Sequence, residues 1–284
     1  MKKRKDSSVW MVLPLYLFTV VFVMCPLIYM FALSFATPNA GYGVTWKFTL
    51  ENYKKILEPV YLGTFVQSLQ LALTSTLLIT LIGYPFGYFM AKLPGKKKQK
   101  AQLLLNIPFW VNSLIRLYGW IIILQKKGVL NFVLLKLHII KEPLSILYSY
   151  PAIVIGMVYV LLPFMITSVY SSAEKLDWSY VEAARDLGAS KIQAFLTVSL
   201  KLTLPGLLSG VILTFIPSMG LFFIADILGG NKIVLVGSLI QDQMTRGSNW
   251  PFAAALAVVM MILTTVLIMI YKKVTNAKEL EGIG

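Results

Sequence analysis

Six long stretches of apolar residues divide the sequence. Charged side chains are absent from residues 7–46, 59–91, 143–173, 202–225 and 247–271, and only Arg116 interrupts the stretch 101–125. A helix needs about 20 mainly apolar residues to cross the hydrocarbon core of a bilayer. The strands of a membrane barrel would instead alternate over segments of about ten residues. The pattern therefore predicts an all-α membrane protein with six spans, near residues 10–35, 64–91, 101–124, 147–170, 203–226 and 251–271.

The composition indicates a lipid environment. Hydrophobic residues make up 57% of the 284 residues and charged residues only 13%, whereas about 25% of the residues in a typical soluble domain are charged. The net charge of +14 would suit nucleic acid as a partner. In membrane proteins, however, lysine and arginine collect in the cytoplasmic loops. We therefore expect contact with membrane lipid and none with nucleic acid.

The basic residues also orient the predicted spans. If the N-terminus is inside, the inner segments hold sixteen lysines and arginines: Lys2, Lys3, Arg4, Lys5, Lys92, Lys96, Lys97, Lys98, Lys100, Lys175, Arg185, Lys191, Lys201, Lys272, Lys273 and Lys278. The outer segments hold nine, and four of these lie in one segment, 125–145. Because the excess marks the cytoplasmic side, we expect both termini in the cytoplasm. The apolar run from Val9 to Phe35 exceeds the ~7–15 residues of a signal-peptide core, which predicts a retained first helix.

Residues that could support catalysis, a metal ion or a nucleotide are scarce. Cys25 and His138 are the single cysteine and the single histidine, which leaves no framework for a disulfide or a metal. The sequence has no G-x-x-x-x-G-K-[ST] run, the loop that cradles nucleotide phosphates. We expect no catalytic residue, no metal and no cofactor in this chain.

The segment 171–202, between the predicted fourth and fifth spans, is the longest one on the cytoplasmic side. Ser179 and Glu182 have the spacing of a capping box, in which each side chain accepts a hydrogen bond from a backbone N–H at the start of a helix. Gly188 follows, and glycine commonly ends a helix in the left-handed conformation. The spacing predicts a short helix over 180–187 that ends at this glycine.

A second capping box, Ser190 with Gln193, predicts another helix that leads into the fifth span. The pair of helices could rest on the membrane surface. The first helix, however, carries the acidic side chains Glu182 and Asp186, and anionic lipid repels such a face. We therefore expect this helix to fit a groove on a protein partner.

The sequence Glu182-Ala-Ala184, followed by Gly188, resembles the EAA loop of permeases from bacterial ABC importers, which lies between two spans in the same way. The resemblance implies the type I ABC-importer permease fold, with a cytoplasmic coupling helix that docks into a cleft on a separate ATPase. It implies that six residues contact the ATPase: Ser179, Glu182, Ala183, Ala184, Asp186 and Gly188. Two positions depart from the family pattern, Lys201 in place of the usual proline and Val198 in place of isoleucine, so the end of the loop could differ.

Further strings extend the resemblance to permeases of the PotB type in spermidine/putrescine importers. They are Phe48–Tyr53, Pro108–Gly119, Tyr170–Asp177, Met219–Gly230 and Trp250–Phe252. The resemblance implies a polyamine permease in a bacterial inner membrane that forms half of the translocation path. Its implied partners are a second, similar permease, an ATPase dimer that binds ATP and magnesium, and an extracytoplasmic polyamine-binding protein.

The sequence divides into three expected regions. Residues 1–63 hold the N-terminal tail, the first transmembrane helix and an outer loop. Residues 64–271 form an importer transmembrane domain of five helices that includes the 171–202 loop, and 272–284 form a cytoplasmic tail. No segment between spans exceeds roughly 32 residues, so we expect no fused ATPase or binding domain.

A polyamine path requires carboxylates for ammonium groups and aromatic faces for cation–π contacts. Asp226 is the one acid within a predicted span, ~30 Å along a straight helix from Gly206. Aromatic and polar residues of the third and fifth spans complete the candidate set: Trp110, Asn112, Tyr118, Trp120, Phe222 and Phe223. The aromatic residues could equally be anchors at the membrane interface.

Arg116 is a second isolated charge in a predicted span, ~22 Å along the helix from Ala101. A charge inside a bilayer requires a partner, and Asp226 is the nearest acid by this estimate of depth. The sequence leaves two interpretations open. Either Arg116 and Asp226 form a structural ion pair, or Asp226 serves the substrate on a path for which Arg116 is also a candidate, although its positive charge would repel a polyamine.

Three other functions remain as alternatives. A permease for another small solute would share the architecture. A secondary transporter would be expected to contain internal repeats or a relay of intramembrane acids, and the sequence has neither. A multi-pass membrane enzyme would require convergent ionisable groups, and only Arg116 and Asp226 lie within the spans.

Overall fold

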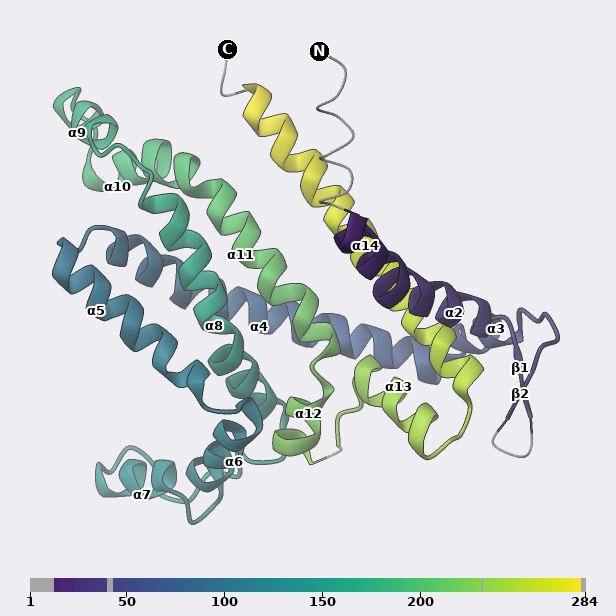
Figure 1. The fold of residues 1–284 in the computed structure, drawn as a ribbon. Helices are drawn as coiled ribbons and strands as arrows, with labels where there is room; N and C mark the ends of the chain where they lie inside the picture. The colour runs from purple at the N-terminus through teal and green to yellow at the C-terminus, as the bar shows by residue number, and fades with distance from the viewer. Residues whose placement is uncertain (1–12, 40–42, 231, 282–284) are drawn as a thin grey trace, which may run out of the picture. The chain divides into compact units, whose positions relative to one another are not determined.

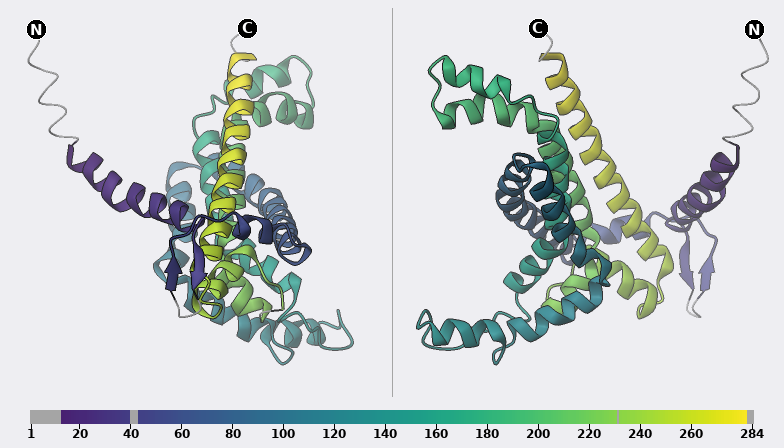
Figure 2. Two further views of the ribbon diagram at one scale, coloured as in Figure 1. Left: turned by 90° about the vertical axis from the view of Figure 1, so that its right-hand side faces the viewer. Right: turned by 60° about the vertical axis from the view of Figure 1, so that its left-hand side comes forward.

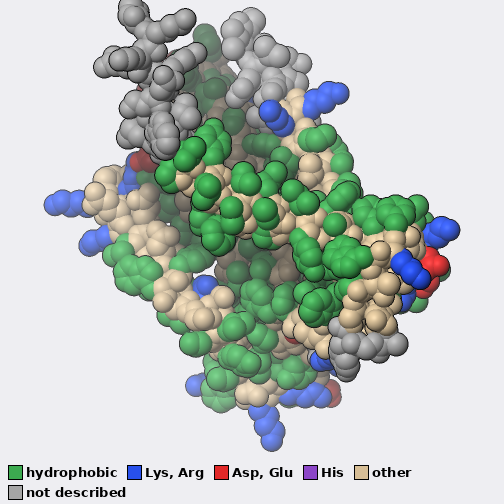
Figure 3. Space-filling model, turned by 45° about the vertical axis from the view of Figure 1, so that its right-hand side comes forward, with side chains coloured by type: hydrophobic (Ala, Val, Ile, Leu, Met, Phe, Trp, Pro, Cys, Tyr) green, Lys and Arg blue, Asp and Glu red, His purple; other side chains and the backbone are tan. Residues whose placement is uncertain are grey.

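The computed structural model describes residues 13–39, 43–230 and 232–281, with side chains up to residue 273. Within this part of the chain, six helical stretches are long and apolar enough to cross a membrane. They are Leu13–Leu33, Pro59–Ala91, Ser113–Lys136, Tyr150–Ala173, Lys191–Gly220 and Trp250–Lys273. The expected all-α fold with six spans is confirmed. Hydrophobic side chains cover much of the face shown in Figure 3, as a surface in contact with acyl chains requires.

The described residues form two compact units. One consists of the residues up to Leu62 together with Leu239–Val266, and the other of Gly63–Ser238 together with the residues from Leu267 onward. Two long helices, α4 (Pro59–Ala91) and α14 (Trp250–Glu281), and the shorter α13 (Val236–Thr245) contribute to both (Figure 1).

The first unit contains the first span and a small extramembrane element. Helix α2 (Cys25–Leu33) follows the π-helical turn η1 (Val20–Met24), and the hairpin of β1 (Thr37–Asn39) and β2 (Gly43–Thr45) precedes α3 (Glu51–Ile56). Asn52 ties α3 to the end of α2, because its side-chain amide donates to the carbonyls of Ser34 and Ala36 at 2.9 Å each. These bonds fix where the chain leaves the first span.

The second unit is built around α8 (Tyr150–Ala173), which has the largest buried share of the six spans. Helices α4 and α11 (Leu200–Gly220) both approach α8 through glycines. A Cβ at Gly83 would lie 2.7 Å from Cγ of Met165, and one at Gly210 would lie 2.5 Å from Sδ of the same methionine. Small residues allow helix backbones to pack closely inside a membrane. The paired glycines of these spans therefore serve packing within the chain.

The third span is not the single helix expected over 101–124. The chain forms α5 (Gly95–Asn106), the 3-10 turn η2 (Ile107–Trp110) and α6 (Ser113–Leu124), with Val111 extended between them. Proline lacks a backbone donor and disfavours the helical conformation before it, and Pro108 lies at this break. Asn112 then starts α6 by accepting the backbone N–H of Leu114 at 2.8 Å. A short helix, α7 (Val129–Lys136), follows after another break.

The fifth span also ends earlier than the expected 203–226. Helix α11 stops at Gly220, and Leu221 leaves the helical region with φ −76° and ψ 63°. Pro217 removes a backbone donor from the last turn, and glycine is a weak helix former. A separate helix, α12 (Phe222–Gly229), then packs against α8. Asp226 therefore lies on a short helix and not at the end of a continuous span.

The close approach of α4 to α8 yields a test of this packing. A Cβ at Gly87 would lie 2.7 Å from the carbonyl oxygen of Ile166 and 2.9 Å from Cβ of Val169. Because backbone must move to relieve the clash, we expect Gly87→Ala to destabilise the folded protein by about 1–3 kcal/mol. Thermal unfolding of the purified protein measures the loss. The matched control is Gly119→Ala in α6, where a Cβ meets no atom within 4 Å. Equal melting temperatures for the two variants would contradict the packing.

Candidate coupling site and substrate path

Two short helices lie between α8 and α11, where the sequence predicts them. Helix α9 (Ser179–Asp186) ends at a turn, and Gly188 in that turn has φ +92°, as expected for a left-handed residue. Helix α10 (Lys191–Ala194) follows. We call residues 179–194 the α9–α10 knob. Figure 2 shows it at one end of α8 and α11, opposite α7.

The outer face of the knob has the features of a protein contact surface. Leu187 is 90% exposed and Tyr180 is 60% exposed. Glu182 and Asp186 are exposed on the same helix. Exposed apolar side chains rimmed by charges are typical of a protein–protein contact surface. The expected coupling residues Ser179, Ala183 and Ala184 share this helix, with Ala184 half-buried.

The start of α9 differs from the expected capping box at Ser179 and Glu182, and that prediction is wrong. Ser179 is the first helical residue, and its backbone N–H donates to Oδ1 of Asp177 at 3.0 Å. An ionised carboxylate is a stronger acceptor than a serine hydroxyl, so Asp177 takes the capping role two residues earlier. The same hydrogen bond lowers the pKa of Asp177.

The second capping box, at Ser190 and Gln193, is confirmed. Oγ of Ser190 accepts the backbone N–H of Gln193 at 3.3 Å, and the Gln193 side chain accepts the Ser190 N–H at 2.9 Å. The helix then runs without a break from Lys191 to Gly220, through the π-helical turn η3 (Phe195–Ser199). Lys201, at the position where the family usually has proline, lies inside this continuous helix.

An aromatic cluster fastens the knob to the second span. The ring of Tyr88 on α4 lies 5.6 Å from Trp178, just before α9, and 5.4 Å from Phe195 at the start of η3. Nζ of Lys92 lies 4.5 Å from the Tyr88 centroid and 4.7 Å from that of Trp178. Cation–π contacts and edge-to-face ring contacts both favour this arrangement. The residues on either side of the knob thus pack directly against α4.

Two buried hydrogen bonds continue this link into α11. The Tyr88 hydroxyl donates to Oγ of Ser199 at 2.8 Å. The Tyr84 hydroxyl lies 2.7 Å from Oγ1 of Thr203, which itself donates to the Ser199 carbonyl. All four side chains are buried. Satisfied polar groups in a buried network specify one arrangement of the helices that carry them.

An ion pair on the same side of the unit connects α5 with the end of α8. Nζ of Lys98 lies 3.1 Å from Oε1 of Glu174, and the Tyr170 hydroxyl donates to that oxygen at 2.6 Å. The Tyr170 bond, and then Lys98, hold the pKa of Glu174 below its ordinary value. Glu174 therefore stays ionised at neutral pH, and the contact weakens only when the pH falls through this lowered pKa.

The expected path residues fall on neighbouring elements. Trp110 in η2 and Tyr118 on α6 are exposed, while Trp120 packs against Tyr159 with ring centroids 5.5 Å apart. Helix α6 contacts α12, which carries Phe222 and Phe223 with centroids 6.3 Å apart. Asn112 is engaged in capping α6.

Arg116 and Asp226 do not form the ion pair that the sequence left open. The guanidinium of Arg116 lies over the rings of Phe109 at 5.2 Å and Tyr159 at 5.4 Å. Asp226 accepts a hydrogen bond from the Ser238 hydroxyl at 3.0 Å. The estimate of equal depth assumed straight helices, and both helices break, at Val111 and at Leu221.

The sequence analysis missed an open groove between α5, α8 and α11, with a volume of about 790 Å³. Its lining is rich in hydroxyl side chains from one face of α8: Thr167, Ser168, Ser171 and Ser172. The ring of Phe109 meets that of Phe164 at 5.8 Å at its border. The hydroxyl residues recur at the i, i+4 spacing of one helix face, which is a signal that the sequence contained.

Comparison with known proteins places this arrangement in a class. A bacterial ABC transporter that imports the acidic polysaccharide alginate matches with a TM-score of 0.70 at 16% identity, over 97% of this chain and 96% of that one. The MetNI methionine ABC transporter matches with a TM-score of 0.58 at 20% identity, over 78% and 99%. The protein has the permease fold of type I ABC importers.

The family follows from sequence. Residues 83–278 match the model of the binding-protein-dependent transport system inner membrane component, and the chain belongs to that family. It is 44% identical to the spermidine/putrescine transport system permease protein PotB of Escherichia coli (strain K12), over 92% of this chain and 97% of that protein. The PotB of Haemophilus influenzae is 41% identical over 92% and 93%. The chain is thus a multi-pass inner membrane permease.

The buried contact between Tyr88 and Ser199 can be measured. Tyr88→Phe and Ser199→Ala each leave one buried hydroxyl without its partner, so we expect each to reduce stability by about 1–3 kcal/mol. The double variant should lose less than the sum of the two, because no unsatisfied hydroxyl remains. Thermal unfolding of the four proteins gives the coupling energy. Tyr180→Phe, which removes an exposed hydroxyl, is the control. Strict additivity would mean that the bond does not contribute.

Proposed function

We propose that this chain forms half of the translocation path of an ATP-driven polyamine importer, with spermidine or putrescine as the substrate. The observation that carries the proposal is the match to spermidine/putrescine permeases over nearly the whole chain, 44% identical over 92% of its length. The residues 83–278 that match the family model include the α9–α10 knob, whose exposed surface suits a partner protein. The chain itself is no enzyme in this proposal. ATP and magnesium bind to a separate ATPase, and this chain binds no cofactor.

The knob supplies the coupling. Glu182, Asp186 and the exposed apolar side chain of Leu187 would enter a cleft on one subunit of an ATPase dimer. The aromatic contacts of Trp178 and Tyr88 would then transmit the motion of that subunit to α4 and α11. The same proposal puts the knob and both termini in the cytoplasm, in agreement with the excess of basic residues in the inner segments.

Two further partners complete the proposed transporter. A second, similar permease would supply the other half of the path. An extracytoplasmic polyamine-binding protein would deliver the substrate at the end opposite the knob. In support, a solved transporter of the same fold, the alginate importer, is described in complex with a substrate-bound periplasmic protein.

The path residues proposed for this chain lie on η2, α6 and α12. Trp110 and Tyr118 expose aromatic faces, which attract ammonium groups. Asp226 supplies a carboxylate on α12, held by Ser238. The guanidinium of Arg116 makes cation–π contacts with two aromatic rings, so we assign it a structural role beside the path.

The coupling role of the knob is tested by Glu182→Lys and Gly188→Val. The first reverses a charge on the docking face. The second places a β-branched residue at φ +92°, which such residues resist. We expect both proteins to insert and fold normally and to lose polyamine uptake in cells that express the complete transporter. The matched control is Glu58→Lys, a charge reversal at an exposed acid before α4. Wild-type uptake by both knob variants, at wild-type expression, would rule out the assignment.

The role of Asp226 is tested by Asp226→Asn. If the carboxylate receives an ammonium group, we expect normal amounts of folded protein and a loss of uptake by roughly 10-fold or more, since charge-assisted hydrogen bonds contribute about 1.5–3 kcal/mol. Because no ion pair joins the two residues, adding Arg116→Gln should not restore uptake. Radiolabelled spermidine uptake and protein level are measured separately. Competition by an unlabelled solute other than a polyamine would instead identify a different substrate.

A further inference from the structure

The segment 125–145 contains an apolar surface that no other part of the described unit covers. Val129, Phe132 and Val133 are exposed on α7, and Leu137 and Ile139 are exposed directly after it. The spacing i, i+3, i+4 and i+8 places the first four on one helix face. Phe132 lies at the centre of this stripe and is 65% exposed. We call residues 125–145 the α7 hairpin.

The α7 hairpin is a preformed element. The buried side chain of Asn131 donates to the carbonyls of Gln125, Lys126 and Leu144 at 2.9–3.3 Å, and its Oδ1 accepts the backbone N–H of Leu144 at 2.9 Å. One side chain thus joins the beginning and the end of the hairpin. These hydrogen bonds fix the hairpin in a conformation that leaves its apolar stripe exposed.

The hairpin lies crosswise to the spans of its unit. In both views of Figure 2, α7 extends sideways at the end of α8 and α11 opposite the α9–α10 knob. If the spans of this unit run across the bilayer, a helix in this direction would lie parallel to the membrane surface. Helix α7 forms the last part of the apolar stretch Ser113–Lys136, but residues 125–128 leave the helix and separate α7 from α6. Its own length of 8 residues corresponds to ~12 Å, too short to cross a bilayer.

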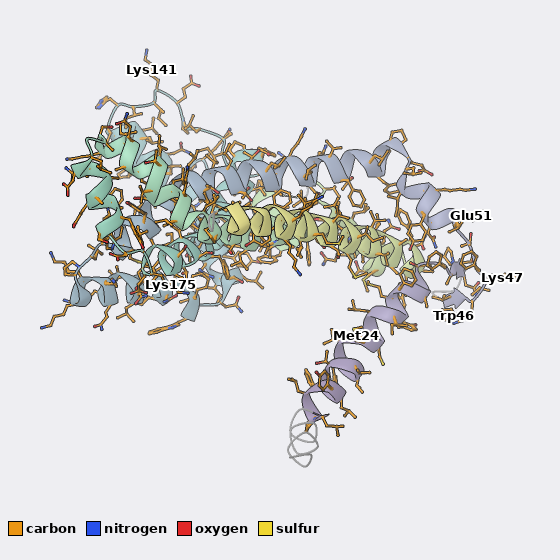
Figure 4. All side chains as sticks on the ribbon, turned by 90° about the horizontal axis from the view of Figure 1, so that it is seen from above. Met24, Trp46, Lys47, Glu51, Lys141 and Lys175 are labelled. Carbon is orange, nitrogen blue, oxygen red and sulfur yellow. The ribbon has the colours of Figure 1, made fainter. Side chains whose placement is uncertain are left out.

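The charges of the hairpin are almost all positive. Lys126, Lys127, Lys136 and Lys141 are exposed, against one exposed acid, Glu142. Figure 4 shows Lys141 projecting away from the helices. Lysines usually collect in cytoplasmic loops, and this hairpin lies at the end of the unit opposite the knob (Figure 2). Their presence here therefore requires a local cause. Phosphate groups at a bilayer surface provide one.

We propose that the α7 hairpin is an interfacial anchor. The stripe around Phe132 enters the boundary between headgroups and acyl chains, and the lysines bind the phosphates of anionic phospholipids. An exposed apolar face flanked by lysines is the pattern of helices that lie in the membrane interface. Long lysine side chains reach from such a face to the headgroups. The anchor would fix the broken third span, because α7 follows α6 directly in the chain.

The occupant is lipid and not a water-facing protein partner for a geometric reason. The hairpin projects sideways at the end of a bundle whose helices cross a bilayer. The membrane surface is therefore the apolar environment closest to its stripe. The apolar part of the proposal requires only that the chain spans a membrane, and it is independent of the substrate. The placement of the four lysines on the extracytoplasmic side rests on the proposed function, which puts the opposite end, with the knob, in the cytoplasm.

A fluorescence experiment tests the apolar half. Phe132→Cys is prepared in a Cys25→Ser background, labelled with an environment-sensitive fluorophore, and measured in the full chain in nanodiscs. We expect blue-shifted emission that nitroxide-labelled lipids quench and aqueous iodide does not. The matched control is Tyr180→Cys on α9, an exposed aromatic position on another 8-residue helix. There, iodide should quench and lipid nitroxides should not. Iodide quenching at both positions would overturn the anchor.

A second arm tests the headgroups. The blue shift at position 132 should grow as phosphatidylglycerol replaces phosphatidylcholine, and should lose this dependence when Lys126, Lys127, Lys136 and Lys141 are changed to glutamine. Equal emission in neutral and anionic nanodiscs would overturn the recognition of anionic lipid. If position 132 becomes protected only after the extracytoplasmic binding protein is added, the hairpin binds protein, and the proposal is wrong.

Discussion

The close approach of α4 and α11 to α8 is the contact on which the second unit depends. Inside a bilayer, apolar side chains gain little by leaving lipid for protein, so helices associate through close van der Waals packing and hydrogen bonds. Met165 on α8 fills the space that Gly83 and Gly210 leave on its two sides. The Ser168 hydroxyl adds a hydrogen bond to the Gly206 carbonyl at 2.8 Å. These contacts fix three spans as one body.

The α9–α10 knob is supported by these three packed helices. The knob lies at the junction of α8 and α11, and Tyr84 and Tyr88 of α4 bond to the first turns of α11. The loop between α8 and α11 is thus held by contacts with all three packed helices. In the proposed function, a force from the ATPase on α9 would therefore be distributed over all three helices.

Hydropathy was sufficient to identify six spans because the lipid sets a minimum apolar length that leaves a strong signal. Breaks within spans leave a weaker one. Pro108 and Pro217 lie at the two breaks, yet Pro85 and Pro163 lie inside continuous helices, since neighbours in a membrane bundle satisfy the freed backbone groups. Sequence alone could not separate these two outcomes. For the same reason, the estimate of equal depth for Arg116 and Asp226, which assumed straight helices, did not hold. In the knob, the left-handed conformation of Gly188 could be predicted because glycine adopts it readily. The cap of α9 could not, because the Asp177 carboxylate accepts the hydrogen bond in place of the expected Ser179 hydroxyl.

The π-helical turn η3 has a consequence for the direction in which the knob points. A π-turn contains one residue more than the corresponding part of an α-helix, and each residue of an α-helix adds about 100° of rotation and about 1.5 Å of rise. The extra residue between Phe195 and Ser199 therefore sets the azimuth of the knob around the α11 axis. With Ser199 bonded to Tyr88, the exposed face of the knob points about 100° away from the direction that an uninterrupted helix would give it. In the proposed transporter, one extra residue in this helix would thus set the direction in which the knob contacts the ATPase.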